Sequence, residues 1–141
     1  MEKTILLDTN MLIGALDGQP GNSQHSQAKQ QLQALLKDPQ TTLAISPLIR
    51  YEVLRFPNSP ERIQALKDAL NGFIEFEINA AVGNLAAEIF RNFEPAMRKE
   101  EKRKFDIFHF ATAKIYGLSL DTQDTGFPAI QKIYEKLSPH A

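Results

Sequence analysis

The sequence contains no cysteine among its 141 residues, which excludes a disulfide framework, a thiolate metal site and a cysteine nucleophile. No apolar run approaches the roughly 20 residues that a membrane-spanning helix needs. Residues 1–3 lead directly into a short apolar segment rather than into a signal-type leader. The net charge is only −1, so the chain is not a generally basic nucleic-acid coat protein. We therefore expect a soluble, cytoplasmic protein with no membrane contact, whose basic residues could serve a nucleic acid only locally.

The hydrophobic content of 43% is enough for a core, and the length fits one domain over residues 1–141. Short, continuous apolar runs occur at residues 4–7, 43–45, 73–78 and 118–120. Such runs are typical of parallel strands that are buried on both faces. Longer segments with helical spacing lie between them. The sequence therefore predicts a three-layer α/β/α fold around a central, mostly parallel sheet of four to five strands.

Helix boundaries are marked by proline and glycine. Ser46 and Pro47 form an N-cap and a first helical residue, and Pro60 opens the next helix in the same way. Gly72 follows the end of that helix, and Gly117 follows a strongly apolar helix predicted over residues 106–116.

Four acids stand where buried elements begin or end: Asp8, Glu52, Asp106 and Asp124. A carboxylate is seldom buried unless a partner or a metal ion compensates for its lost hydration. Asp8 ends the first strand and Asp124 follows the last, and ligands of open α/β sheets bind outside the carboxyl ends of the strands. We therefore predict one cation site built from four segments. For Asp8, the N-cap of a helix starting at Met11 is an equally good interpretation; for Asp124, so is a turn before Gly126.

Glu52 lies on the apolar stripe of the helix that starts at Pro47, and this stripe is predicted to face the core. The stripe consists of Ile49, Val53 and Phe56. A glutamate on such a stripe binds a cation or pairs with a buried base. The alternative is a side chain that reaches solvent at the edge or forms a salt bridge to Arg50 or Arg55.

Asp106 is predicted to be the first residue of its helix, so a simple N-terminal cap competes with a metal-binding role. His109, one turn later, could contact phosphate or carry a proton near the pocket. We expect instead a packed or surface histidine, because the predicted chemistry needs none.

The donors in this predicted site are all oxygen atoms, which favours Mg²⁺ or Mn²⁺ over Zn²⁺. Acids that hold such ions suit phosphodiester hydrolysis. The basic segment at residues 98–104 leads into Asp106. Its side chains could bind phosphate groups of a substrate or form a solvated, salt-bridged helix face. The candidates for phosphate contact are Arg98, Lys102, Arg103 and Lys104.

In their order and spacing, several pieces of the sequence resemble the PIN-domain nucleases, and among them the VapC-type toxins of bacterial toxin–antitoxin pairs. These pieces are residues 6–10, Ser46 and Pro47 with Glu52, Asp106 with Ala111 and Ala113, and residues 122–124 with Phe127. The resemblance implies a PIN-like fold and a Mg²⁺-dependent endoribonuclease that cuts single-stranded or loop regions of RNA. It also implies a small antitoxin protein as partner and a homodimer, whose interface Leu12, Ile13 and Leu16 could build unless they belong to the core.

Carried over to this sequence, the resemblance makes the four acids the catalytic metal ligands. Asn10 would support the pocket, and the hydroxyl of Thr9 or Thr122 would orient an acid or contact phosphate. Thr122 could equally satisfy the turn at a strand end. The chain departs from the family in two ways: residues 128–137 are predicted as a helix with no strand after them, and Asp121 adds an acid near Asp124. The alternative function is a non-catalytic PIN-like module that binds RNA or protein.

Overall fold

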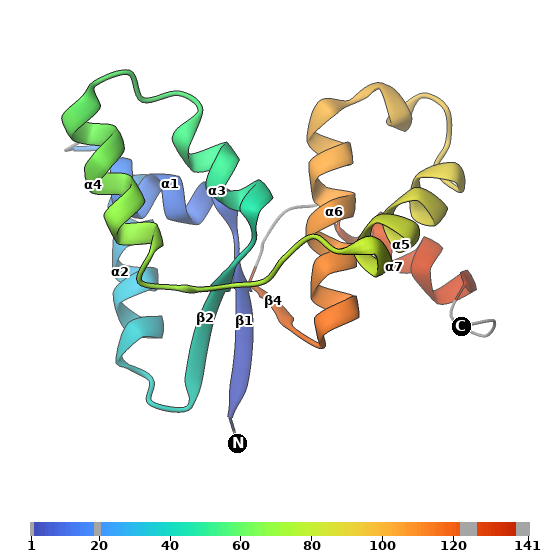
Figure 1. The fold of residues 1–141 in the computed structure, drawn as a ribbon, viewed down its shortest axis with the longest axis horizontal. Helices are drawn as coiled ribbons and strands as arrows, with labels where there is room; N and C mark the ends of the chain where they lie inside the picture. Colours follow the sequence, from blue (N-terminus) through green and yellow to red (C-terminus); the bar gives the residue numbers. More distant parts are fainter. Residues whose placement is uncertain (1, 19–20, 122–126, 138–141) are drawn as a thin grey trace.

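Four short strands form a parallel sheet in the computed structural model, which describes residues 2–18, 21–121 and 127–137 (Figure 1). The strands are β1 (Lys3–Leu7), β2 (Thr41–Ile45), β3 (Ile74–Glu75) and β4 (Ser119–Asp121), in the spatial order β3-β2-β1-β4. All their pairings are parallel, and Leu6 lies opposite Ala44 on one side and Leu120 on the other. The apolar runs at β1 and β2 are thereby confirmed as central strands, because a strand covered on both faces needs no polar side.

Two groups of helices cover the two faces of the sheet (Figure 1). One group is α1 (Thr9–Asp17), α2 (Ser23–Lys37), α3 (Pro47–Leu54) and α4 (Pro60–Leu70). The other group is α5 (Ala80–Arg91), α6 (Glu101–Tyr116) and α7 (Phe127–Leu137), with a short 3₁₀ turn, η1 (Met97–Lys99), before α6. The predicted three-layer α/β/α architecture is confirmed.

Each side of the sheet has its own apolar core. The first packs β1 and β2 against α1 to α4 and includes Leu12 and Leu70, which are fully buried. The second joins α5, α6 and α7 around Ile89 and Ile130, also fully buried. Leu12 thus belongs to the core, and Ile13 and Leu16 pack partly buried against it. Helices α1 to α3 pack in the first core, and α6 packs mainly in the second. Helices α3 and α6 therefore lie on opposite sides of the sheet, and side chains of both helices meet at its edge.

The predicted helix boundaries at proline and glycine are confirmed. The Ser46 hydroxyl accepts a hydrogen bond from the backbone N–H of Ile49 at 3.3 Å, and Pro47 is the first residue of α3. Gly117 ends α6 in the left-handed conformation, with φ of +68°, where a side chain would be strained.

Three predicted boundaries are wrong. Helix α6 begins at Glu101, more than a turn before Asp106, and β3 is shorter than the predicted 73–78. Helix α3 ends at Leu54, so Phe56 leaves the core-facing stripe and is 75% exposed. Within the described residues, no helix is both long and apolar enough to cross a membrane.

Candidate active site

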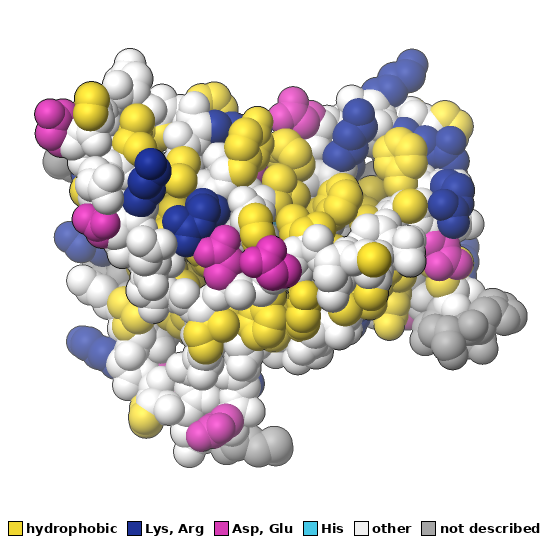
Figure 2. All heavy atoms as spheres, in the orientation of Figure 1, with side chains coloured by type: hydrophobic (Ala, Val, Ile, Leu, Met, Phe, Trp, Pro, Cys, Tyr) yellow, Lys and Arg dark blue, Asp and Glu magenta, His cyan; other side chains and the backbone are white. Residues whose placement is uncertain are grey.

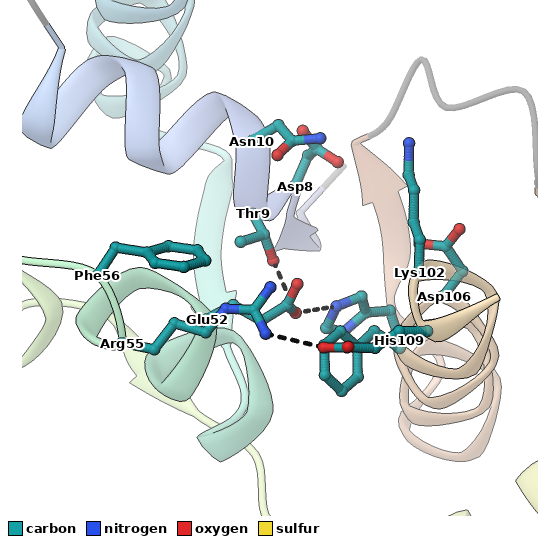
Figure 3. Close-up of a pocket in the computed structure, with 11 residues that line it drawn as sticks. Asp8, Thr9, Asn10, Glu52, Arg55, Phe56, Lys102, Asp106 and His109 are labelled. Atoms are coloured by element: carbon teal, nitrogen blue, oxygen red, sulfur yellow. Dashed lines mark hydrogen bonds and ion pairs between the residues drawn. The ribbon is translucent and has the colours of Figure 1, made fainter.

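A pocket of about 680 Å³ opens at the carboxyl edge of the sheet, between α3 and α6 (Figure 3). It is lined by Asp8, Thr9, Asn10, Glu52, Arg55, Phe56, Glu101, Lys102, Phe105, Asp106 and His109. Three of the four acids singled out in the sequence are therefore brought to one pocket, from three separate elements. Two of the supporting residues, Thr9 and Asn10, line it as well.

Asp8 directly follows β1, and its side chain both caps helix α1 and lines the pocket. Its Oδ2 accepts a hydrogen bond from the backbone N–H of Met11 at 2.9 Å, which makes Asp8 the N-cap of α1. The cap interpretation is confirmed, although α1 begins at Thr9 rather than at Met11. The cap also fixes where the carboxylate points, because the bond ties it to the first turn of α1.

Glu52 lies in α3, and its Oε1 atom is held from two sides. The Thr9 hydroxyl donates to it at 3.2 Å, and the His109 Nε2 atom lies 2.6 Å from it (Figure 3). An ionised carboxylate can only accept, so in a hydrogen bond to ionised Glu52 the Nε2 atom of His109 would be the donor. The predicted alternative, a salt bridge to Arg50 or Arg55, is wrong.

The two arginines beside Glu52 have other partners. Arg50 binds the carboxylate of Glu75 through Nε and Nη2, the shortest contact being 2.7 Å. Arg55 binds Glu101 at 3.0 Å, and this hydrogen bond, followed by one to Tyr51, raises the pKa of Arg55 above its usual value. The Arg55–Glu101 pair joins the end of α3 to the start of α6.

Asp106 is 6% exposed and lies in the second turn of α6. The guanidinium of Arg103, one turn earlier, is 3.4 Å from its Oδ2 atom and 3.3 Å from Glu100. The competing interpretation, in which Asp106 caps the helix, is wrong, because α6 begins at Glu101 and Glu100 is its N-cap. Asp106 is instead a buried acid on the pocket side of the helix, with a cation beside it.

The four candidates for phosphate contact separate in the structure. Arg98 donates to the main-chain oxygens of Phe93 and Arg91, at 2.9 and 2.7 Å, and so ties the end of α5 to η1. Of the four, only Lys102 lines the pocket; Lys104 is exposed outside it. Figure 2 shows Lys and Arg side chains over the end of α5, η1 and the start of α6, and others on the left of the same face, over α3 and α4.

The fourth acid, Asp124, and Thr122 lie outside the described residues. Among the residues that the structure does describe, no three acidic, histidine or cysteine side chains are close enough together to hold a metal ion. The chain leaves β4 near the pocket, because Asp121 lies opposite Leu7, the residue before Asp8. The three carboxylates that line the pocket are the type of ligand that Mg²⁺ and Mn²⁺ prefer. Within the described residues, however, they do not lie close enough together to form a three-residue metal site.

Sequence reasoning missed Arg55, Phe56, Glu101 and Phe105 as pocket residues, and for His109 it weighed a place near the pocket but favoured a packed or surface histidine. His109 is 8% exposed, as a packed histidine should be, but its Nε2 atom contacts Glu52 in the pocket. Its spacing of three residues from Asp106 places both on one helix face and could have indicated this. For Phe56, the signal was Pro57, because a residue before proline rarely continues a helix.

Comparisons with known proteins agree with this geometry. The PIN domain family matches residues 5–133 of the chain, whereas no curated protein matches its sequence. A chain of a toxin–antitoxin complex from Klebsiella pneumoniae is 30% identical with a TM-score of 0.59, and the match covers 86% of this chain and 87% of that one.

Two further solved structures are similar in fold. VapBC2 from Rickettsia felis, bound to a DNA fragment from the promoter, has a TM-score of 0.65 at 19% identity, covering 90% of this chain and 92% of that one. VapC20 of Mycobacterium tuberculosis, described as a toxin that cleaves the sarcin-ricin loop, has a TM-score of 0.63 at 20% identity, covering 89% and 93%. The resemblance found in the sequence is confirmed, and the chain belongs to the PIN-domain family.

Proposed function

We propose that this protein is a metal-dependent endoribonuclease that hydrolyses RNA phosphodiester bonds, and the toxin of a type II toxin–antitoxin pair. The observation that carries the proposal is the convergence of Asp8, Glu52 and Asp106 on one pocket at the carboxyl edge of the sheet. Membership of the PIN-domain family supports the nuclease activity, and the similarity to a toxin–antitoxin complex supports the biological role.

Mg²⁺ or Mn²⁺ would be held by Asp8, Glu52 and Asp106, with Asp124 as the fourth acid. The donor set fits these ions, because hard divalent cations prefer carboxylate oxygens and the pocket contains no thiolate. When bound, such an ion lowers the pKa of the attacking water and neutralises charge on the leaving oxygen.

The other polar residues in the pocket hold these acids and receive the substrate. Thr9 and His109 hold the Oε1 atom of Glu52 by hydrogen bonds. Because both oxygens belong to one carboxylate, these contacts also set the direction of Oε2. Arg103 lies beside Asp106 and balances its buried charge. Lys102 faces the pocket and would contact a phosphate group of the RNA, while Asn10 would support the pocket wall.

An acidic pocket of this kind also explains how a small antitoxin would act. A helix of the antitoxin lying in a surface groove could place a basic side chain among the acids and so block the metal site. We further propose that the protein forms a homodimer. We also propose that it acts in the cytoplasm, where it would meet both its RNA substrate and its antitoxin.

The test is cleavage of transfer, ribosomal and unstructured RNAs by the purified protein with Mg²⁺, with Mn²⁺ and with chelator. The variants are Asp8→Asn, Glu52→Gln and Asp106→Asn, which remove charge with little change of shape. Asp68→Asn is the matched control, because Asp68 is an exposed acid on α4 outside the pocket.

We expect metal-dependent cutting by the wild type and the Asp68 variant, and none by the three pocket variants. If the folded, partner-free protein cuts none of these RNAs but binds RNA or protein, the non-catalytic module is the correct interpretation. Cutting that persists in chelator would contradict the metal-dependent mechanism.

A further inference from the structure

Phe56 is an exposed aromatic residue in the wall of the acidic pocket. Its side chain is 75% exposed, more than any other large hydrophobic residue that the structure describes. A single exposed apolar residue on a protein surface needs no explanation. Phe56 differs because it lines the same pocket as the three acids, on the α3 side, across from Lys102 and Asp106 on α6 (Figure 3).

The inner side of the Phe56 ring is supported by Arg55. The guanidinium carbon of Arg55 lies 4.8 Å from the ring centroid of Phe56 and 5.3 Å from that of Phe105. Arg55 is itself anchored to Glu101 across the pocket mouth at 3.0 Å. A cation stacked on one side of a ring holds it in place and leaves the other face for a second planar group.

We propose that Phe56, backed by Arg55, is a stacking platform for an unpaired base next to the phosphodiester bond that is cut. The proposal rests on the proposed nuclease function and names the residue of this chain that would hold a base of the single-stranded RNA that the family resemblance implies. Bases of unpaired RNA stack on aromatic side chains regardless of sequence, whereas bases inside a duplex cannot reach one.

The composition of the pocket suits two of the chemical parts of a nucleotide, the phosphate and the base. The acids would hold a metal ion at the phosphate that is cut, Lys102 would offer a cation to a neighbouring phosphate, and Phe56 would offer an apolar ring face to the base. Because Arg55 already pairs with Glu101, its part is to support the ring rather than to bind phosphate.

The platform can be tested without any cutting. Oligoribonucleotides carrying 2-aminopurine at successive positions are titrated with the full-length protein in chelator, because the fluorescence of this base is quenched when it stacks. The same oligonucleotides annealed to a complementary strand provide the duplex comparison. The variants are Phe56→Ala and Phe56→Trp, with Leu36→Ala as the control, since Leu36 is 61% exposed on α2 outside the pocket.

We expect quenching at one or two positions with the wild type, Phe56→Trp and Leu36→Ala, and its loss in Phe56→Ala. The affinity of Phe56→Ala for single strands should fall about 5- to 100-fold, the usual effect of removing one stacked base, with duplex binding unchanged. A thermal melt like that of the wild type checks that Phe56→Ala is folded. Single-strand binding and quenching equal to wild type in folded Phe56→Ala would overturn the platform.

The two proposals fail in different ways. If Phe56→Ala cuts and binds RNA as the wild type does, the nuclease stands and the platform is wrong. If the wild type binds single strands through Phe56 but cuts none of them with Mg²⁺ or Mn²⁺, the platform stands and the nuclease function is wrong.

Discussion

The hydrogen bond between His109 and Glu52 gives a prediction whose size follows from the structure. The Nε2 atom of His109 and the Oε1 atom of Glu52 are 2.6 Å apart. Both side chains are largely buried, with 10% of the His109 side chain and 13% of the Glu52 side chain exposed. A hydrogen bond to a charged group stabilises by about 1.5–3 kcal/mol. A free-energy change of about 1.4 kcal/mol corresponds to a tenfold change in an equilibrium constant. Loss of this hydrogen bond should therefore weaken metal binding and cutting that depend on the position of Glu52 by roughly 10- to 100-fold.

Two variants separate positioning from packing. His109→Phe keeps a ring in the buried site but cannot donate to Glu52, whereas His109→Gln can still donate through its amide. We expect His109→Phe to need more Mg²⁺ for half-maximal cutting and to cut about 10- to 100-fold more slowly at limiting metal, because groups that orient a metal ligand typically contribute this much. His109→Gln should recover most of the difference.

The assay is the initial rate of RNA cutting as a function of Mg²⁺ concentration, with a thermal melt of each variant beside it. A purely structural role would lower the melting temperature of His109→Phe without changing its metal dependence. The reasoning is refuted if folded His109→Phe has the rate and the Mg²⁺ midpoint of the wild type while Glu52→Gln is inactive.

Three further predictions concern stability and are measured by urea unfolding. Asp8→Ala should be about 1 kcal/mol less stable than Asp8→Asn, because only asparagine can still cap α1; equal stabilities would show that the cap contributes nothing. Gly117→Ala should destabilise by about 1 kcal/mol, since φ is +68° there although a methyl group would meet no neighbour within 4 Å; no change would contradict the left-handed cap. Ile130→Ala should cost about 2–5 kcal/mol, because Ile130 is fully buried in the second core, and a loss below that range would mean that α7 packs loosely.

Local chemistry made much of the fold predictable. Proline after an N-cap serine fixed the start of α3, and glycine in the left-handed region fixed the end of α6. The start of α6 was missed because its N-cap, Glu100, makes no side-chain capping bond, and residues 101–104 are charged and show no apolar stripe.

Three of the four candidate acids could be singled out from the sequence because carboxylates are rare beside apolar elements, but their partners could not. His109 and Glu52 are 57 residues apart in sequence, and Arg55 and Glu101 are 46 apart. Neither pair leaves a periodicity or a spacing that a single sequence can show, because both depend on how α3 and α6 meet over the sheet. The exposure of Phe56 likewise follows from where α3 stops rather than from the residue's hydrophobicity.

The contacts across the pocket also have a mechanical consequence. Glu52 with His109, and Arg55 with Glu101, fasten the helical layer on one side of the sheet to the layer on the other. A ligand that binds residues of both layers stabilises the contact between them. At a free concentration about 100 times its dissociation constant, it adds about 2.7 kcal/mol to the free energy of unfolding. Metal, RNA or a blocking partner that contacts both layers would each add such stability, so binding of any of them should raise the protein's resistance to proteolysis.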